Sequence, residues 1–182
     1  MHDITFITSN PNKVKELGEC LGFSIKHQNL DLPEIQSLSL EKVAIAKAEF
    51  AFREIKSSVL IEDNALIFSA LNNLPGSFIK HFFESLKNEG LTKILNAYDN
   101  REALALSCFV LRDENGSKVF MGETKGVVAD KPRGENGFGW DAIFMPAGSN
   151  MTWAEMSKEE KQKTSMRAKA LEKLSDYLKN DL

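Results

Sequence analysis

Cysteine is scarce in this sequence, and long hydrophobic runs are missing. The 182 residues include only Cys20 and Cys108, which lie in apolar segments without the spacing of metal ligands. This pattern predicts two buried, reduced thiols and therefore a cytoplasmic protein. The first residues lack the charged-then-apolar pattern of a signal peptide, and no apolar run approaches membrane-spanning length, so we expect no membrane partner.

A strong excess of one charge is also missing. The net charge is only −3 at pH 7, which argues against the broad basic face that nucleic-acid binding needs. A local basic pocket for one small polyanion stays compatible with this balance. The hydrophobic and charged fractions, 42% and 27%, are those of an ordinary globular protein, and the length predicts a single domain over residues 1–182.

The glycine-rich P-loop pattern is absent, but the chain opens with another arrangement that suits a phosphate. Residues 4–8 predict a strand, Asn10 and Pro11 favour the start of a helix, and apolar residues then recur at helical spacing to Leu21. Such a strand, turn and helix place free backbone N–H groups at the rim of a sheet. Lys13 in the first helical turn opposes the helix dipole, which a nearby anion would explain.

Residues 59–64 run from three β-favouring apolar residues into two adjacent carboxylates, Glu62 and Asp63. They predict a short buried strand, 59–63, that ends at the sheet rim, where ligands bind in open α/β sheets. The two carboxylates are either solvated turn residues or ligands of Mg²⁺, which takes one or two carboxylates and leaves its other positions to water and phosphate.

The remaining elements are read from periodicity, composition and turn residues. Gly90 separates two helices, and an Asn-Gly turn joins two hairpin strands. Lys47 falls on a helix, where a lysine is usually solvated. The expected elements are strand 23–27, helix 40–55, extended segment 65–71, helices 78–87 and 91–98, hairpin strands 103–112 and 118–128, loop 129–139, strand 142–145 and helix 170–178.

Two aromatic residues, Phe138 and Trp140, are flanked by Gly137 and Gly139. They either pack in the core or form a platform for a nucleotide base, which the glycines would allow to approach closely.

Helix-capping patterns follow at Thr152 and Ser157, each with a glutamate three residues later. On one continuous helix Lys161 and Arg167 would point about 120° apart. If both grip one ligand, we expect a helix break near Ser165.

The order of these segments resembles the inosine triphosphate pyrophosphatase family, and more closely its eukaryotic-type branch. The resemblance extends from Ile4 to about Leu174. It is carried by Phe6-Ile7-Thr8-Ser9-Asn10-Pro11-Asn12-Lys13, Asp31-Leu32-Pro33-Glu34, Leu60-Ile61-Glu62-Asp63, Leu74-Pro75-Gly76 with Ile79-Lys80, Phe138-Gly139-Trp140-Asp141, and Glu160-Lys161 through Ser165-Met166-Arg167.

The resemblance implies an α/β fold with an elongated mixed β-sheet flanked by helices, and two lobes with a nucleotide cleft between them. It also implies a homodimer that hydrolyses inosine and xanthosine (deoxy)nucleoside triphosphates to the monophosphate and pyrophosphate with Mg²⁺, and so clears deaminated purines.

The same resemblance assigns site residues. The base is Asp63, which would act with Lys13, and Glu62 is a candidate for sharing that task. The metal ligands are Glu34 and Asp63. The substrate-binding residues are Thr8, Ser9, Asn10, Lys13, Lys47, Asn64, Lys80, Phe138, Gly139, Trp140, Asp141, Lys161, Met166 and Arg167.

The chain departs from the family at several of these positions. Ser9 stands where glycine is usual, Asn64 where threonine or serine is usual next to the phosphates, and Met166 where a histidine helps to recognise the 6-oxo purine. Methionine has no donor, which should relax base discrimination. Two alternatives therefore stay open: the same chemistry on another modified nucleotide, and a nucleotide-binding regulatory protein with little turnover.

Overall fold

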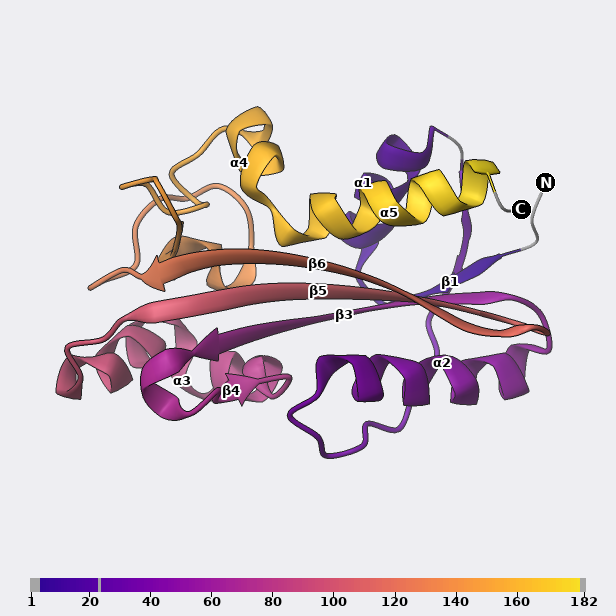
Figure 1. The fold of residues 1–182 in the computed structure, drawn as a ribbon, viewed down its shortest axis with the longest axis horizontal. Coiled ribbons are helices and arrows are strands. Elements are labelled where there is room, and N and C mark those ends of the chain that lie inside the picture. The colour runs from indigo at the N-terminus through magenta and orange to yellow at the C-terminus, as the bar shows by residue number, and fades with distance from the viewer. Residues whose placement is uncertain (1–3, 23, 181–182) are drawn as a thin grey trace.

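The computed structural model describes residues 4–22 and 24–180 (Figure 1). In chain order the elements are β1 (Thr5–Ile7), α1 (Pro11–Leu21), β2 (Lys26–Gln28), α2 (Leu40–Ile55), β3 (Val59–Phe68), β4 (Pro75–Gly76), α3 (Ile79–Ile94), β5 (Glu102–Asp113), β6 (Gly116–Val128), β7 (Phe144–Pro146), α4 (Lys158–Thr164) and α5 (Met166–Asn180). Short 3₁₀ turns cover Ser69–Leu71, Leu95–Ala97 and Gly139–Ile143. Within the described ranges, no helix is long and apolar enough to cross a membrane.

One mixed sheet runs along the elongated molecule, as expected. Its strand order is β2-β1-β3-β5-β6-β7, with β4 paired to β3. Strand β1 is parallel to β2 and β3, and the other pairs are antiparallel. Figure 1 shows α1 and α5 on one face of the sheet and α2 and α3 on the other.

Strand β3 is longer than predicted, so Glu62 and Asp63 lie within a strand and not at its end. Strand β5 pairs with β3 along its whole length, from Val59 opposite Arg112 to Phe68 opposite Ala103. Because side chains alternate along a strand, the two neighbouring carboxylates point to opposite faces of the sheet. They are therefore not the side-by-side turn residues that the sequence suggested.

The other edge of β3 is open in its middle. Strand β1 pairs with β3 only as far as Leu60, and β4 begins to pair at Leu66. Among the described residues, 61–65 have no strand partner on that edge. This notch in the sheet edge is defined by residues 61–65 of β3, and side chains from both faces can reach it.

Several predicted boundaries are wrong. The break in the helical segment that follows β4 falls at Lys87, with φ 55°, and not at Gly90. The expected strand 142–145 begins only at Phe144, because Gly139–Ile143 forms a 3₁₀ turn. The second strand is Lys26–Gln28, and the predicted start at Phe23 lies outside the described residues.

The two cysteines differ, against the prediction that both are buried. Cys108 is buried on β5, but Cys20 is exposed. Leu17 and Leu21 occupy the buried side of α1, so Cys20 falls on its outer side.

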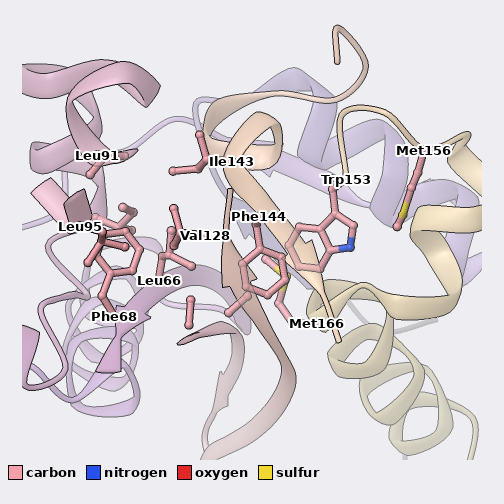
Figure 2. Close-up of a cluster of buried hydrophobic side chains, with 13 residues drawn as sticks. Leu66, Phe68, Leu91, Leu95, Val128, Ile143, Phe144, Trp153, Met156 and Met166 are labelled. Atoms are coloured by element: carbon pink, nitrogen blue, oxygen red, sulfur yellow. The ribbon is translucent and has the colours of Figure 1, made fainter. Parts of the chain in front are cut away.

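Hydrophobic clusters pack on both faces of the sheet. One includes Leu17 of α1 and Leu171 of α5, and the cluster on the other face includes Ala44 and Ala48 of α2. A third cluster joins Phe144, Trp153 and Met166 to the buried side of α3 (Figure 2). The start of α5 is therefore anchored in the core.

Gly122 of β6 allows that anchoring. A Cβ atom at this position would lie 1.9 Å from the Met166 carbonyl oxygen and 2.7 Å from the Ala170 backbone nitrogen. Both are backbone atoms, which cannot move away as a flexible side chain could. Only glycine lets the first turn of α5 lie this close to the sheet.

We expect Gly122→Ala to lower the free energy of unfolding by about 2–3 kcal/mol, since the added methyl group must push α5 away from β6. Urea denaturation followed by circular dichroism measures the change. Glu123→Ala, at the exposed neighbouring position, serves as the control and should stay near the wild-type midpoint. Equal midpoints for both variants would contradict the close packing described here.

Candidate functional site

A cavity of about 400 Å³ opens on the face of the sheet that carries α1 and α5. Its lining comes from α1, β3, the loop before β7, α4 and α5. The lining residues are Glu16, Glu19, Cys20, Asn64, Phe138, Gly139, Trp140, Asp141, Lys158, Glu159, Lys161, Gln162, Ser165, Met166, Arg167, Ala168 and Leu171. The segment Phe138–Asp141 and the pair Met166–Arg167, predicted from the resemblance, therefore meet in one cavity.

Asp141 organises one wall of this cavity. Its buried carboxylate accepts hydrogen bonds from the Phe138 backbone N–H at 2.8 Å and from Lys161 Nζ at 2.5 Å. The Lys161 ammonium in turn lies 5.3 Å from the centre of the Phe138 ring. Phe138 itself is 42% exposed, which favours the platform interpretation over core packing.

Trp140 combines the two roles that the sequence left open. Its ring lies 5.9 Å from Phe144 and 5.8 Å from Trp153, so it packs against the core while it lines the cavity. Met166 also packs against the core and lines the cavity, and only 8% of its surface is exposed.

The helix break expected near Ser165 is present. α4 ends at Thr164, and Ser165 has an extended backbone with ψ 126°. Its hydroxyl accepts hydrogen bonds from the backbone N–H groups of Arg167 and Ala168, so it caps α5. The break brings Lys161 and Arg167 to the same cavity, which one straight helix could not do. Of the two expected capping boxes, that of Ser157 starts a helix, whereas that of Thr152 stabilises only a turn.

Glu62 joins three elements around one buried carboxylate. Its side chain is fully buried and receives two hydrogen bonds of 2.9 Å from Arg167 of α5. Lys13 of α1 lies 3.4 Å from Glu62 Oε1, and Asn64 Nδ2 donates to the same oxygen at 3.2 Å. Burial alone would raise the pKa of Glu62, but the charges of Lys13 and Arg167 outweigh it and hold this pKa at about 2. Glu62 is therefore ionised at neutral pH and is a poor proton acceptor there.

Arg167 lines the cavity, but the protein itself occupies most of its donors. Besides Glu62, the guanidinium donates to the Glu16 carboxylate and to the Lys13 carbonyl oxygen. It thereby ties the first turn of α1 to β3. Sequence reasoning missed Glu16, although its place three residues after Lys13 puts both on one side of α1.

Asp63 belongs to a second cluster on the opposite face. Lys47 Nζ lies 2.7 Å from Asp63 Oδ2 and 2.5 Å from Glu34 Oε1. Lys47 is buried on α2 in line with Leu40, Val43 and Ala44, so it is not the solvated lysine that its helix alone suggested. Burial raises the pKa of Asp63 in spite of Lys47, whereas Lys47 holds the pKa of Glu34 below its usual range against the effect of burial.

The oxygen atoms of this second cluster suit a hard divalent cation. Asp63 Oδ2 is buried and lies 2.7 Å from the Lys47 ammonium. Glu34 is partly exposed and converges with Asp63 on one point, the Lys47 ammonium. The described residues contain no group of three or more potential metal-ligating side chains. Two carboxylates are nevertheless a usual protein contribution to Mg²⁺.

The two clusters meet at the notch. The charge of Lys13 lowers the pKa of Asp63 as well as that of Glu62, so this lysine acts on both faces. The charge of Lys80 lowers the pKa of Glu34 in the same way, and His81, which the sequence did not assign to the site, lies 3.8 Å from Glu34.

The predicted residues outside the cavity lining are Thr8, Ser9, Asn10, Lys13, Glu34, Lys47, Asp63 and Lys80. Thr8 Oγ1 accepts a hydrogen bond from the Asn10 N–H at 3.1 Å, which shapes the turn before α1.

Comparisons with known proteins agree on one family. Residues 4–177 match the sequence model of the Ham1 family. An inosine triphosphate pyrophosphatase of Aspergillus fumigatus is 45% identical over 97% of this chain and 95% of its own. A dITP/XTP pyrophosphatase of Methanopyrus kandleri is 39% identical over 98% and 97%. The solved structure of a HAM1 protein from Coxiella burnetii superimposes with a TM-score of 0.87 at 30% identity, covering 98% of this chain and 99% of that one.

We expect Glu62→Gln to lower the free energy of unfolding by about 3 kcal/mol at pH 7, because it leaves Arg167 and Lys13 without their buried counter-charge. Chemical denaturation gives the value. Glu19→Gln removes the partner of Lys158 in an exposed ion pair and should change little. Similar losses of unfolding free energy in both variants would mean that the buried ion pairs of Glu62 contribute no more than the exposed pair of Glu19 and Lys158.

The pH dependence of stability should also reflect the buried ion pairs of Glu62. The folded pKa of Glu62, about 2, lies below its reference value of 4.5, so its contribution is present above pH 4.5 and disappears as pH falls towards 2. Wild-type stability should therefore decline over this range, and Glu62→Gln should decline less. Parallel curves for the two proteins would contradict the low pKa.

Proposed function

Since this chain belongs to the Ham1 family, we propose that it hydrolyses inosine and xanthosine (deoxy)nucleoside triphosphates to the monophosphate and pyrophosphate. The observation that carries the proposal is the meeting, at Glu62–Asn64 of β3, of an aromatic-walled cavity with a cluster of lysines and carboxylates. The names of the Aspergillus and Methanopyrus relatives support the choice of substrate.

The triphosphate binds at the lysine-rich end of the site. Lys13, Lys47 and Lys80 come from three different helices and act on three carboxylates, those of Glu62, Asp63 and Glu34. Thr8, Ser9 and Asn10 precede α1, whose first backbone N–H groups suit a phosphate oxygen. Phosphoryl transfer depends mainly on positioning and on such charge stabilisation, so these groups lower the barrier by neutralising the phosphates.

The base binds in the cavity. The half-exposed Phe138 ring offers a stacking face, and Gly139 leaves space beside it because it carries no side chain. Asp141, Lys161 and Trp140 form the adjoining wall. The Lys161 ammonium and the backbone N–H and C=O groups next to it are the groups that reach the edge of a purine.

Asp63 is the proton acceptor, and Lys13 is the cation that accompanies it. A water oxygen forms a bond to the α-phosphorus, the bond from the α-phosphorus to the bridging oxygen breaks, and pyrophosphate leaves. The proton of the water passes to the Asp63 carboxylate, whose pKa is raised by burial. Glu62, with its pKa of about 2, holds Lys13 and Arg167 in place and takes no proton.

The fit of Glu34 and Asp63 to a hard cation supports Mg²⁺ as the cofactor. When bound, Mg²⁺ would supply neutralisation of the phosphate oxygens. The Lys47 ammonium, 2.5 Å from Glu34 Oε1 and 2.7 Å from Asp63 Oδ2, balances part of the charge of the two carboxylates.

We also propose that the enzyme is a cytoplasmic homodimer that binds no nucleic acid. The free thiols and the net charge of −3 are consistent with that assignment.

Met166 favours a second candidate, the same hydrolysis of another modified nucleotide. It lines the cavity with a thioether that donates no hydrogen bond to a base. Substrate range is therefore the part of the proposal that depends most on one side chain.

Pyrophosphate release should be fastest with inosine and xanthosine triphosphates in a panel that includes adenosine, guanosine and modified pyrimidine triphosphates, assayed with Mg²⁺. Asp63→Asn should lower kcat at least about a hundredfold, since the proton acceptor is lost, while nucleotide binding by calorimetry stays measurable.

Asp99→Asn, the same change at an exposed position, is the control and should turn over normally. Normal turnover by Asp63→Asn would remove the catalytic assignment. Release from none of the substrates by the wild type would favour a nucleotide-binding regulatory protein, and a maximum on another base would favour the second candidate.

Met166→His should raise the preference for inosine over adenosine triphosphate by about tenfold, because the imidazole adds a donor that can bind a 6-oxo group. The ratio of kcat/KM values measures it. Met156→His, in the same buried cluster but outside the cavity lining, tests whether the effect needs the cavity position. An unchanged ratio in Met166→His would mean that residue 166 does not contact the base.

A further inference from the structure

The Phe138 ring stands on a backbone that glycine makes flexible. Gly137 and Gly139 on either side have φ values of 77° and 63°, a left-handed conformation that glycine adopts without strain. The same freedom allows this segment other conformations, so the direction of the half-exposed ring depends on contacts with the rest of the protein. Asp141 accepts the hydrogen bond of the Phe138 N–H, which fixes one side of the ring's backbone. The Gly139 side needs a contact from another element.

Asn88 of α3 supplies that contact. Its Nδ2 atom donates a hydrogen bond to the Gly139 carbonyl oxygen at 3.0 Å, although the two residues are 51 positions apart in the chain. The opposite orientation of the amide would set two carbonyl-type oxygens against each other, so the nitrogen is the atom that faces Gly139. The Oδ1 atom is buried and has no hydrogen-bond partner among the described residues. Asn88 therefore acts through its donor.

The kink in α3 places Asn88 at this point. Lys87 has a φ of 55°, and the helix resumes with Asn88 as its first residue. Leu91 follows three residues later and is fully buried in the same core cluster as Ile143, the last residue of the 3₁₀ turn that Gly139 opens (Figure 2). The second half of α3 thus holds this turn at both ends, by a hydrogen bond at Gly139 and by apolar packing at Ile143.

We propose that Asn88 is a positioning residue for the base: its hydrogen bond to Gly139 sets the direction in which Phe138 presents its ring. Within the described ranges, Gly139 lines the cavity and Asn88 does not, so Asn88 acts through the loop and does not touch the nucleotide. This inference rests on the proposed function, because the ring serves a base only if the cavity binds a nucleotide. A loop already held in its binding conformation need not be ordered by the ligand, which favours binding. The chemistry at Asp63 is not affected.

Asn88→Ala should raise KM for inosine triphosphate about fivefold, the effect of losing one neutral hydrogen bond, and leave kcat unchanged. Pyrophosphate carries no base and competes only at the phosphate end, so its inhibition constant should be the same in the wild type and the variant. An unchanged KM, an equal rise in KM and in the inhibition constant, or a fall in kcat alone would overturn the proposal.

Two further variants separate the donor from the size of the side chain. Asn88→Asp keeps the shape and loses the donor, so KM should rise at least as much as in Asn88→Ala. Asn88→Gln keeps the donor on a longer side chain and should recover part of the loss. Asn96→Asp is the matched control, because the exposed Asn96 only accepts a hydrogen bond from Arg101, a role that a carboxylate keeps. A wild-type KM in Asn88→Asp would contradict the role of the donor.

Acrylamide quenching of tryptophan fluorescence tests the loop without any substrate. The chain has two tryptophans, and Trp153 is fully buried, so the quencher reaches mainly the half-buried Trp140 in the turn that Gly139 opens. Asn88→Ala should raise the quenching constant, and Asn96→Asp should not. In a Trp140→Phe background the increase should disappear. Increased quenching with an unchanged KM would limit Asn88 to a structural contact and overturn its part in base binding.

Calorimetry with inosine triphosphate keeps the two proposals distinguishable. If no nucleotide is hydrolysed but Asn88→Ala still weakens binding and raises quenching, the proposed function fails and the assignment of Asn88 stands. If hydrolysis is normal and neither the dissociation constant nor the quenching responds to Asn88→Ala, only the assignment of Asn88 fails.

Discussion

The site depends on the buried ion pair between Glu62 and Arg167. These residues are 105 positions apart in the chain, and their hydrogen bonds join the centre of β3 to the start of α5. The same guanidinium reaches Glu16 and the Lys13 carbonyl oxygen, so α1 is fixed by the same contact. Desolvating these charges is expensive, and only a complete set of partners makes the arrangement stable. The positions of Lys13 and Asn64, which both contact Glu62 Oε1, follow from it.

Because side chains alternate along β3, its polar residues are divided between the two faces of the sheet. Glu62 and Asn64 face α1 and α5, and Asp63 faces α2, where Lys47 and Glu34 meet it. The two sets adjoin the notch, where neither β1 nor β4 covers that edge of the strand. Two adjacent carboxylates can therefore have opposite properties: the pKa of Glu62 is lowered by its partners, and the pKa of Asp63 is raised by burial.

Local sequence patterns predicted the elements well where they depend on short-range chemistry. The strand and helix around Pro11, the hairpin β5–β6, helix α2 and the break at Ser165 were all readable from caps, turns and periodicity. The length of β3 was not, because its continuation through Glu62–Asn64 depends on pairing with β5, which is distant in the chain. For the same reason the partners of Glu62 and the buried state of Lys47 could not be read from their neighbours. Ordered motifs indicated which residues belong to the site, but only the tertiary structure divides them between the two faces.

The contact of α5 with Gly122 has a consequence for how such a pocket can diversify. The close approach is made by the Met166 carbonyl oxygen and the Ala170 backbone nitrogen, which every amino acid possesses. This contact of the helix start with β6 therefore does not involve the side chain at 166, which packs separately in the core. An exchange of that side chain would change the chemical character of the cavity wall and leave this backbone contact in place. A mutation at position 166 could therefore alter the substrate range without altering the catalytic residues.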